Sequence, residues 1–322
     1  DGNHKVMIRI FNHDSPDFVY LHIHGGGHCI GAADMQDQSL EKISKDLNCA
    51  VVSVEYRLAP ANPYPAAPDD CEAAAIWLIE NSKSQFKTEK IVIGGESAGA
   101  NLSAVTLQRL KSKGLLDNVK GANLIYGSYD ARLTPSTLRQ QSSDEIFLLS
   151  YEMIRKFRDS YFQGSLDLSL PDISPIQGDL SGMPPALFTV GTRDLLLDDS
   201  LFMYGRWLSY GANAKIIIVP GADHAFNAFP SDTTTQVEIK IYDQGKGIDL
   251  KEKNKIFDRF YTDRIDNRDQ HSGLGLSISY EIINLFNGSI ELTESDKLDF
   301  RGACFLIKLP LKSQNNHKGI QS

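Results

Sequence analysis

Short runs of apolar and β-branched residues alternate with longer amphipathic stretches along roughly the first 220 residues. The runs are typical of buried parallel strands, and the stretches between them have helical periodicity. This alternation predicts an α/β fold on a mostly parallel sheet. The predicted strands are 5–11, 18–23, 50–56, 91–93, 122–126, 186–190 and 215–219, and the predicted helices are 38–47, 69–80, 98–113, 151–162 and 200–210.

Two parts of the chain depart from this alternation. Residues 131–183 are polar with one helical stretch, so we expect an insertion that lies over the sheet edge as a partial helical cap. A polar, threonine-rich joint at 231–236 then leads to different motifs. We therefore expect two domains, residues 1–232 and 233–322, the second ending in a disordered tail.

The stretch Gly95-Glu96-Ser97-Ala98-Gly99 separates a predicted strand from a predicted helix. In this layout a serine occupies a tight turn with its hydroxyl exposed at the sheet edge. Glycines are needed on both sides because the serine backbone is strained and its neighbours are crowded. The pattern also occurs by chance, so its meaning depends on whether the chain supplies partners for Ser97.

Those partners follow in chain order. A serine nucleophile needs a base within hydrogen-bond reach and a carboxylate that orients the base. Asp194 follows the strand at 186–190, and His224 follows the strand at 215–219. We therefore expect Ser97 to be the nucleophile, His224 the base and Asp194 the orienting acid. Two rival carboxylates are interpreted as charges at the start of the next helix; they are Asp198 and Asp199.

His24-Gly25-Gly26-Gly27 follows another predicted strand. Consecutive glycines let backbone N–H groups approach a ligand closely, so Gly25 and Gly26 are expected to stabilise an oxyanion together with the N–H of Ala98. His24 is expected to brace this loop. The sequence suggests no chemical role for three other residues, which are His22, His28 and Glu96.

Five motifs in this order resemble the hormone-sensitive-lipase-like group of α/β-hydrolase esterases. They are HGGG at 24–27, YRLAPANPYPAA at 56–67, GESAG at 95–99, GTRDLLLDD at 191–199 and GADHAF at 221–226. The resemblance covers about residues 5–230. It implies hydrolysis of short-chain carboxylic esters through an acyl-enzyme, without a cofactor, and the same roles for the residues above. It also implies that part of the N-terminal cap and the last helix of the fold are missing.

The C-terminal part carries a second set of motifs. DQGKGI at 243–248, IFDRFY at 256–261 and SGLGLSI at 272–278 resemble the boxes of the α+β, Bergerat-type ATPase domain of sensor histidine kinases. The sequences at 288–292 and 302–310 resemble the last hairpin of that domain. The resemblance assigns nucleotide contacts to Asp243, Gly245, Gly247, Gly273 and Gly275.

This second set is incomplete. The family's asparagine-bearing helix, which holds magnesium, should precede Val237, where the sequence still belongs to the hydrolase. A phosphoacceptor histidine helix is absent as well. We therefore expect only the C-terminal half of an ATPase domain, with binding of ATP and magnesium as the less favoured alternative. A nucleotide-binding signalling fragment and an inactive chimeric remnant, from a gene fusion, frameshift or assembly artefact, remain alternatives to the esterase.

Composition narrows the classes of partner. The net charge of −8 and the lack of a basic stripe argue against a nucleic-acid binder, and no apolar run reaches the length of a membrane span. The four cysteines have no metal-ligand spacing, so reduced thiols, a cytoplasmic location and no bound metal are expected. The sequence thus predicts a small-molecule ester as substrate and leaves the oligomeric state open.

Overall fold

The computed structural model describes residues 5–139, 149–164, 166–227, 236–253, 255–258, 261, 275–285, 289–294 and 302–310. Within the chain there are two compact units, residues 1–229 and 230–322, and each is described by itself. The C-terminal tail expected from the sequence lies outside the described residues, as does Gly273.

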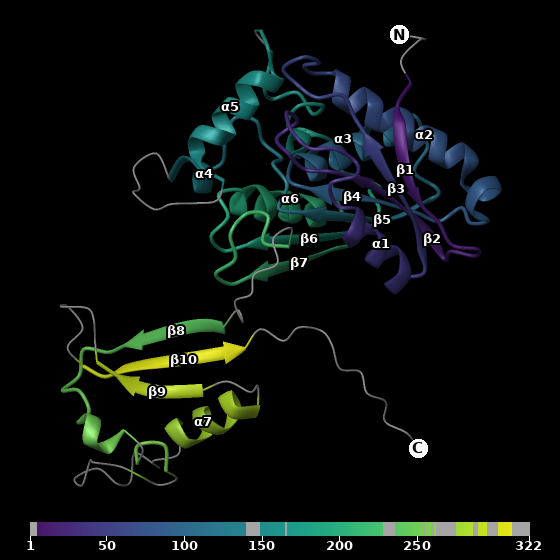
Figure 1. Cartoon of the computed structure of the whole chain (residues 1–322). Helices are drawn as coiled ribbons and strands as arrows, with labels where there is room; N and C mark the ends of the chain where they lie inside the picture. The colour runs from purple at the N-terminus through teal and green to yellow at the C-terminus, as the bar shows by residue number, and fades with distance from the viewer. Residues whose placement is uncertain are drawn as a thin grey trace, which may run out of the picture. The chain divides into compact units, whose positions relative to one another are not determined.

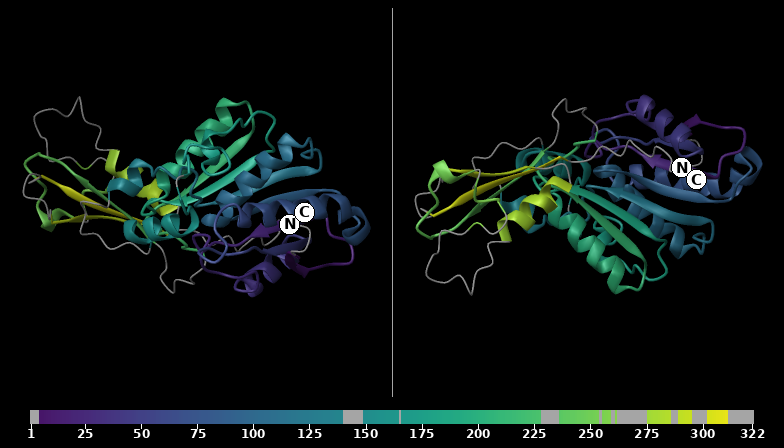
Figure 2. Two further views of the ribbon diagram at one scale, coloured as in Figure 1. Left: turned by 90° about the horizontal axis from the view of Figure 1, so that it is seen from above. Right: turned by 90° about the horizontal axis from the view of Figure 1, so that it is seen from below.

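The first unit contains a seven-stranded sheet in the order β1-β3-β2-β4-β5-β6-β7 (Figure 1). Strand β1 is antiparallel to β3, and each of the other neighbouring pairs is parallel. The parallel strands also run side by side in both views of Figure 2. The strands are β1 (Met7–Phe11), β2 (Phe18–Ile23), β3 (Cys49–Glu55), β4 (Ile91–Glu96), β5 (Val119–Ile125), β6 (Ala186–Gly191) and β7 (Ala214–Val219).

Helices pack on both faces of this sheet because side chains alternate between the faces along each strand. On one face Val19, Leu21 and Ile23 join the main core with residues of α2, α3 and α6. On the other face Tyr20 packs against Leu40 of α1. The helices are α1 (Asp37–Asp46), α2 (Ala66–Phe86), α3 (Ala98–Ser112) and α6 (Leu197–Ser209).

The α1 face is open over β6 and β7. Leu187 and Ile217 point away from the main core and are 36% and 50% exposed, and no helix of the described part packs on them. The sequence predicts that the last helix of the fold is missing after His224, and residues 228–235 of that segment lie outside the described part.

The insertion at 131–183 forms α4 (Pro135–Arg139), α5 (Tyr151–Tyr161) and a 3₁₀ turn, η2 (Pro175–Gln177). The polar character of residues 131–139 concealed α4, which is only five residues long. The start of α5 is capped by Ser150, whose Oγ accepts the N–H of Met153 at 3.2 Å. Ile154 on α5 is buried with Leu149 and Leu196, so α5 covers part of the first unit as the predicted cap.

The second unit contains a three-stranded antiparallel sheet in the order β8-β10-β9. Its small core includes Ile256, Leu292 and Ala303. The elements are β8 (Gln236–Tyr242), the 3₁₀ turn η3 (Leu250–Glu252), α7 (Gly275–Leu285), β9 (Ser289–Thr293) and β10 (Cys304–Pro310). In the described parts of both units, no helix is long and apolar enough to cross a membrane.

Candidate active site

The serine turn has the strained geometry that the sequence predicts. Ser97 lies between β4 and α3 with φ 55° and ψ −118°. Residues other than glycine rarely adopt this backbone conformation. A Cβ at Gly95 or Gly99 would come within 2.0 Å or 1.9 Å of the carbonyl oxygen of Ile23. Only glycine fits at both positions, because β2 and its following loop pass directly over the turn.

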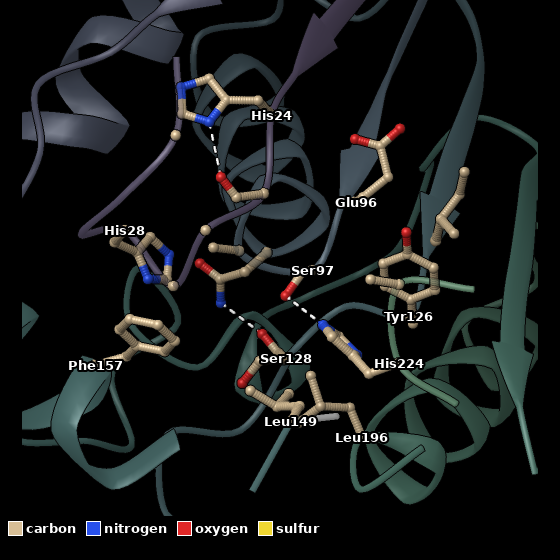
Figure 3. A pocket seen from close by; sticks show the side chains of 18 of the residues that line it. His24, His28, Glu96, Ser97, Tyr126, Ser128, Leu149, Phe157, Leu196 and His224 are labelled. Atoms are coloured by element: carbon tan, nitrogen blue, oxygen red, sulfur yellow. Dashed lines mark hydrogen bonds between the residues drawn. The ribbon is translucent and has the colours of Figure 1, made fainter. Parts of the chain in front are cut away.

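Ser97, His224 and Asp194 come together from three loops that follow parallel strands. Ser97 Oγ lies 2.9 Å from His224 Nε2 (Figure 3), and His224 Nδ1 lies 2.8 Å from Asp194 Oδ2. The other oxygen of Asp194 accepts the N–H of Leu196 at 2.8 Å. Asp194 is 1% exposed and His224 is 8% exposed. A hydrogen on Nδ1 directed at Asp194 leaves Nε2 free to accept the serine proton.

The three predicted oxyanion donors line the same cavity as Ser97. Gly25 lies against the serine, because a Cβ there would be 3.4 Å from Ser97 Cβ. Gly26 has φ +114°, and a Cβ there would come within 1.9 Å of the carbonyl oxygen of Ile30. The N–H of Ala98 belongs to the first turn of α3, where helical N–H groups have no partner within the helix.

The glycine loop is held by aromatic stacking. The His24 ring stacks on Tyr56 at 4.2 Å, and His24 Nδ1 lies 2.7 Å from the carbonyl oxygen of Gly25. His28 stacks on Tyr161 at 3.9 Å, and burial lowers the pKa of His28 to about 4. His24 therefore braces the loop, as the sequence predicts, and a neutral His28 supports it from the cap side.

Sequence reasoning missed a role for Glu96 and His22. Glu96 Oε2 lies 3.0 Å from His22 Nε2, and His22 Nδ1 lies 3.0 Å from Ser53 Oγ. His22 and Ser53 occupy paired positions of β2 and β3, so their side chains share one face of the sheet. A polar residue at a buried, inward-facing strand position is the signal that could have found this row.

Asp199 lies in the first turn of α6, as the sequence predicts, but it is buried, which the sequence did not indicate. Asp199 is 1% exposed and accepts the N–H groups of Tyr129 and Asp130 at 2.6 Å and 3.0 Å. Burial raises its pKa to about 7, although the hydrogen bond from Thr134 opposes this shift. Its neighbour Asp198 accepts the N–H of Ser136 at 2.8 Å, so neither carboxylate competes with Asp194 for His224.

A cavity of about 620 Å³ opens beside Ser97. Its two sides differ in chemistry: Figure 3 shows Phe157 and Leu149 on one side of Ser97 and Glu96 on the other. Apolar side chains of the cap and of the loops beneath it also line the cavity. They are Leu133, Leu149, Met153, Ile154, Phe157 and Leu196.

The fold and the site match a known family. The family described as alpha/beta hydrolase fold matches residues 20–228, about two thirds of the chain. The chain belongs to the α/β-hydrolase family. Its five motifs also place it with the hormone-sensitive-lipase-like esterases that the sequence resembles.

Relatives of this hydrolase agree with that assignment. The ethyl acetate hydrolase of Pseudomonas putida is 28% identical over 234 residues, which are 70% of this chain and 72% of that protein. Carboxylesterase NlhH of Mycobacterium tuberculosis is 33% identical over 243 residues, 71% of this chain and 73% of that protein. A hyperthermophilic esterase from the archaeon Pyrobaculum calidifontis superposes with a TM-score of 0.65 at 29% identity, over 70% of this chain and 79% of that one.

A second family, described as histidine kinase-, DNA gyrase B- and HSP90-like ATPase, matches residues 212–313. This agrees with the ATPase-like motifs of the second unit. Its first residues overlap the hydrolase match, and in the structure Ala214–Val219 is β7 of the hydrolase sheet, paired with β6. The hydrolase is therefore fused to a fragment that resembles part of an ATPase domain.

The structure describes four of the five residues predicted to contact a nucleotide. Asp243 Oδ1 accepts the N–H groups of Gly245 and Ala303 at 2.8 Å and 2.9 Å, and Gly247 has φ +77° in the same loop. Gly275 begins α7. Among the described residues, no group of three histidine, cysteine or acidic side chains could hold a metal ion. In the described part of the second unit these residues supply a carboxylate and a glycine turn, and no reaction step is assigned to a nucleotide.

Proposed function

We propose that this hydrolase is a serine carboxylesterase that cleaves small carboxylic esters through an acyl-enzyme. One observation carries the proposal: the continuous chain of contacts from Ser97 Oγ through His224 to the buried Asp194. The neighbouring cavity supports it, because it offers an apolar side for an acyl chain next to the serine.

In the proposed reaction Ser97 Oγ attacks the ester carbonyl carbon while His224 Nε2 accepts the serine proton. Asp194 keeps the imidazole in the required tautomer and stabilises the imidazolium that forms. The carbon–oxygen bond to the alcohol then breaks, and His224 gives its proton to the departing oxygen. Water attacks the acyl-enzyme with His224 as base, the acid leaves, and the proton returns to Ser97.

Negative charge develops on the ester carbonyl oxygen in the transition state, and the glycine loop must stabilise this charge. We assign its stabilisation to the N–H groups of Gly25, Gly26 and Ala98. Each such donor is typically worth on the order of 3 kcal/mol in the transition state. The α3 terminus adds a favourable dipole, because Ala98 begins the helix. This chemistry uses side chains and backbone groups alone and needs no cofactor.

We also propose a domain boundary near residue 232 and a cytoplasmic location. The two compact units, 1–229 and 230–322, support the boundary. Four free thiols support a reducing compartment: Cys29, Cys49, Cys71 and Cys304.

The test of the proposed function is hydrolysis of p-nitrophenyl acetate and butyrate by the full chain and by Ser97→Ala. We expect the substitution to lower kcat at least about 10⁴-fold. Ser112→Ala, an exposed serine at the end of α3, is the matched control and should retain full activity. The proposal fails if Ser97→Ala keeps more than about a tenth of the wild-type rate.

A further inference from the structure

Glu96 places a carboxylate on the wall of the active-site cavity. The residue is 8% exposed and lines the cavity beside Ser97. Its Oε2 lies 3.0 Å from His22 Nε2, whereas Oε1 has no hydrogen-bond or ion-pair partner among the residues that the structure describes. Oε1 is not among the fully buried side-chain atoms, so this oxygen is accessible from the cavity and available to a ligand.

His22 does not need to carry a charge that would neutralise Glu96. A neutral imidazole with its hydrogen on Nε2 donates to Glu96 and accepts the hydroxyl hydrogen of Ser53 on Nδ1, which satisfies both ring nitrogens. Among the described residues that line the cavity, Arg158 is the single lysine or arginine. It lies on α5 and pairs with Asp159 at 3.0 Å. The side of the cavity that contains Glu96 therefore carries a negative charge.

Two tyrosine rings line the cavity on this same side. Tyr126 lies between Glu96 and His224 in Figure 3, with its ring 4.7 Å from the His224 ring. Tyr20 also lines the cavity, and its hydroxyl lies 3.5 Å from Asn123 Nδ2. Burial, and then the charge of Glu96, raise the pKa of both phenols, so both rings remain neutral. A carboxylate flanked by neutral aromatic rings is a favourable environment for an organic cation.

The position of His224 decides which end of an ester would reach Glu96. His224 Nε2 must deliver a proton to the alcohol oxygen as it leaves, so the alcohol lies on the His224 side of Ser97. Tyr126 and Glu96 extend this side, while Phe157 lies across Ser97 from it. The acyl chain then lies on the apolar side.

We propose that Glu96, with the rings of Tyr20 and Tyr126, binds an alkylammonium group in the alcohol part of the ester. This inference rests on the proposed esterase function and adds a substrate class to it: short-chain esters of amino alcohols. Glu96 acts in binding and takes no part in proton transfer.

The test compares acetylcholine with 3,3-dimethylbutyl acetate, its uncharged isostere, as substrates of the full chain. The readout is the ratio of the two kcat/KM values within each variant, which a general loss of activity does not alter. Wild type should favour the cation about tenfold. Glu96→Gln keeps an acceptor for His22 but removes the charge, so its ratio should fall to about one. Glu80→Gln, the same change at an exposed position of α2, should keep the wild-type ratio.

Several results would overturn the inference. They are a wild-type ratio near one, a preference that survives in Glu96→Gln, and a preference for 2-hydroxyethyl acetate over acetylcholine. If Glu96→Gln does not fold, inhibition of wild type decides: tetramethylammonium should compete with 3,3-dimethylbutyl acetate at concentrations on the order of 10 mM, and neopentyl alcohol should not. If wild type hydrolyses uncharged esters normally but gives any of these overturning results, the proposed esterase function stands and only the inference on Glu96 is rejected. If wild type hydrolyses no ester at all, both the proposed function and this inference are rejected.

Discussion

The buried carboxylate of Asp199 accepts a hydrogen bond from the hydroxyl of Thr134 at 2.6 Å. This bond joins the start of α6 to the segment that leads into the cap. The same carboxylate accepts hydrogen bonds from the N–H groups of Tyr129 and Asp130. Asp199 lies five residues after Asp194 in the sequence. Asp199 therefore ties together the loop of the proposed catalytic acid and one wall of the cavity.

The raised pKa of Asp199 predicts a pH-dependent stability of the hydrolase unit. Its pKa of about 7 exceeds the ordinary value of 3.8, so the native state binds a proton that the unfolded chain has released. Stability should therefore be highest at the acidic end of the window and fall as pH rises from about 4 to 7, by at most on the order of 4 kcal/mol. Asp199→Asn should flatten this dependence, and Asp199→Ala should destabilise at every pH because two N–H groups lose their acceptor.

Tryptophan fluorescence measures this effect in the hydrolase unit alone, since both tryptophans, Trp77 and Trp207, lie there. Urea unfolding of wild type and Asp199→Asn at pH 5 and pH 8 gives the difference directly. Equal pH dependence in the two proteins would contradict the prediction.

Asp194→Asn tests how much the orientation of His224 contributes to catalysis, because His224 itself is still present in this variant. The amide cannot stabilise an imidazolium and favours the wrong tautomer of His224, so kcat should fall by about 10⁴-fold while the unfolding transition is retained. Asp223→Asn, a partly exposed neighbour of His224 that pairs with Arg193, is the matched control. Its kcat should remain within about threefold of wild type. Comparable losses in the two variants would argue against the assigned role of Asp194.

Alanine substitutions at Gly25 and at Gly26 should have different effects on kcat and stability. At Gly25 the added Cβ would press on Glu96 O at 3.0 Å and on the serine, so kcat should fall by on the order of 10²-fold with little change in melting temperature. At Gly26 the positive φ and the contact with Ile30 O should lower stability as well. Gly205→Ala, with open space on α6, should be stabilised by about 0.5–1 kcal/mol. Fluorescence melts and initial rates check all three.

Phe157→Ala should change the preference for acyl length. Phe157 lines the apolar side of the cavity, and its removal makes room there for additional methylene groups. Each buried methylene is worth about 0.8 kcal/mol, so the ratio of kcat/KM for octanoate to butanoate p-nitrophenyl esters should rise about tenfold. Phe202→Ala, a 47% exposed residue of α6, should leave the ratio unchanged. An unchanged ratio in Phe157→Ala would place the acyl chain elsewhere.

Local patterns were enough to predict most elements of the hydrolase unit. The strand at 18–23 and the end of the helix at 98–113 were predicted to within one residue, because their apolar periodicity is strong. The helix expected at 69–80 is longer, Ala66–Phe86, since its polar C-terminal turns carry no periodic signal. The short α4 was missed for the same reason.

Asp199 and Glu96 show why the burial and the contacts of some residues could not be predicted. Both are acidic residues beside a catalytic motif, and nothing in their neighbours along the chain distinguishes a solvated carboxylate from a buried one. Burial depends on what packs from elsewhere: Tyr129 and Thr134 for Asp199, and His22 of a neighbouring strand for Glu96.

The sequence by itself determined the α/β class, the serine turn, and the choice of Ser97, Asp194 and His224, because motif order and strand-end placement are local features of the chain. Only the tertiary structure decided that Glu96 lines the cavity beside His22 and that Asp199 is buried. The physical reason is that a side chain's charge, partners and solvent access are set by residues distant in sequence, which the fold brings within a few ångströms.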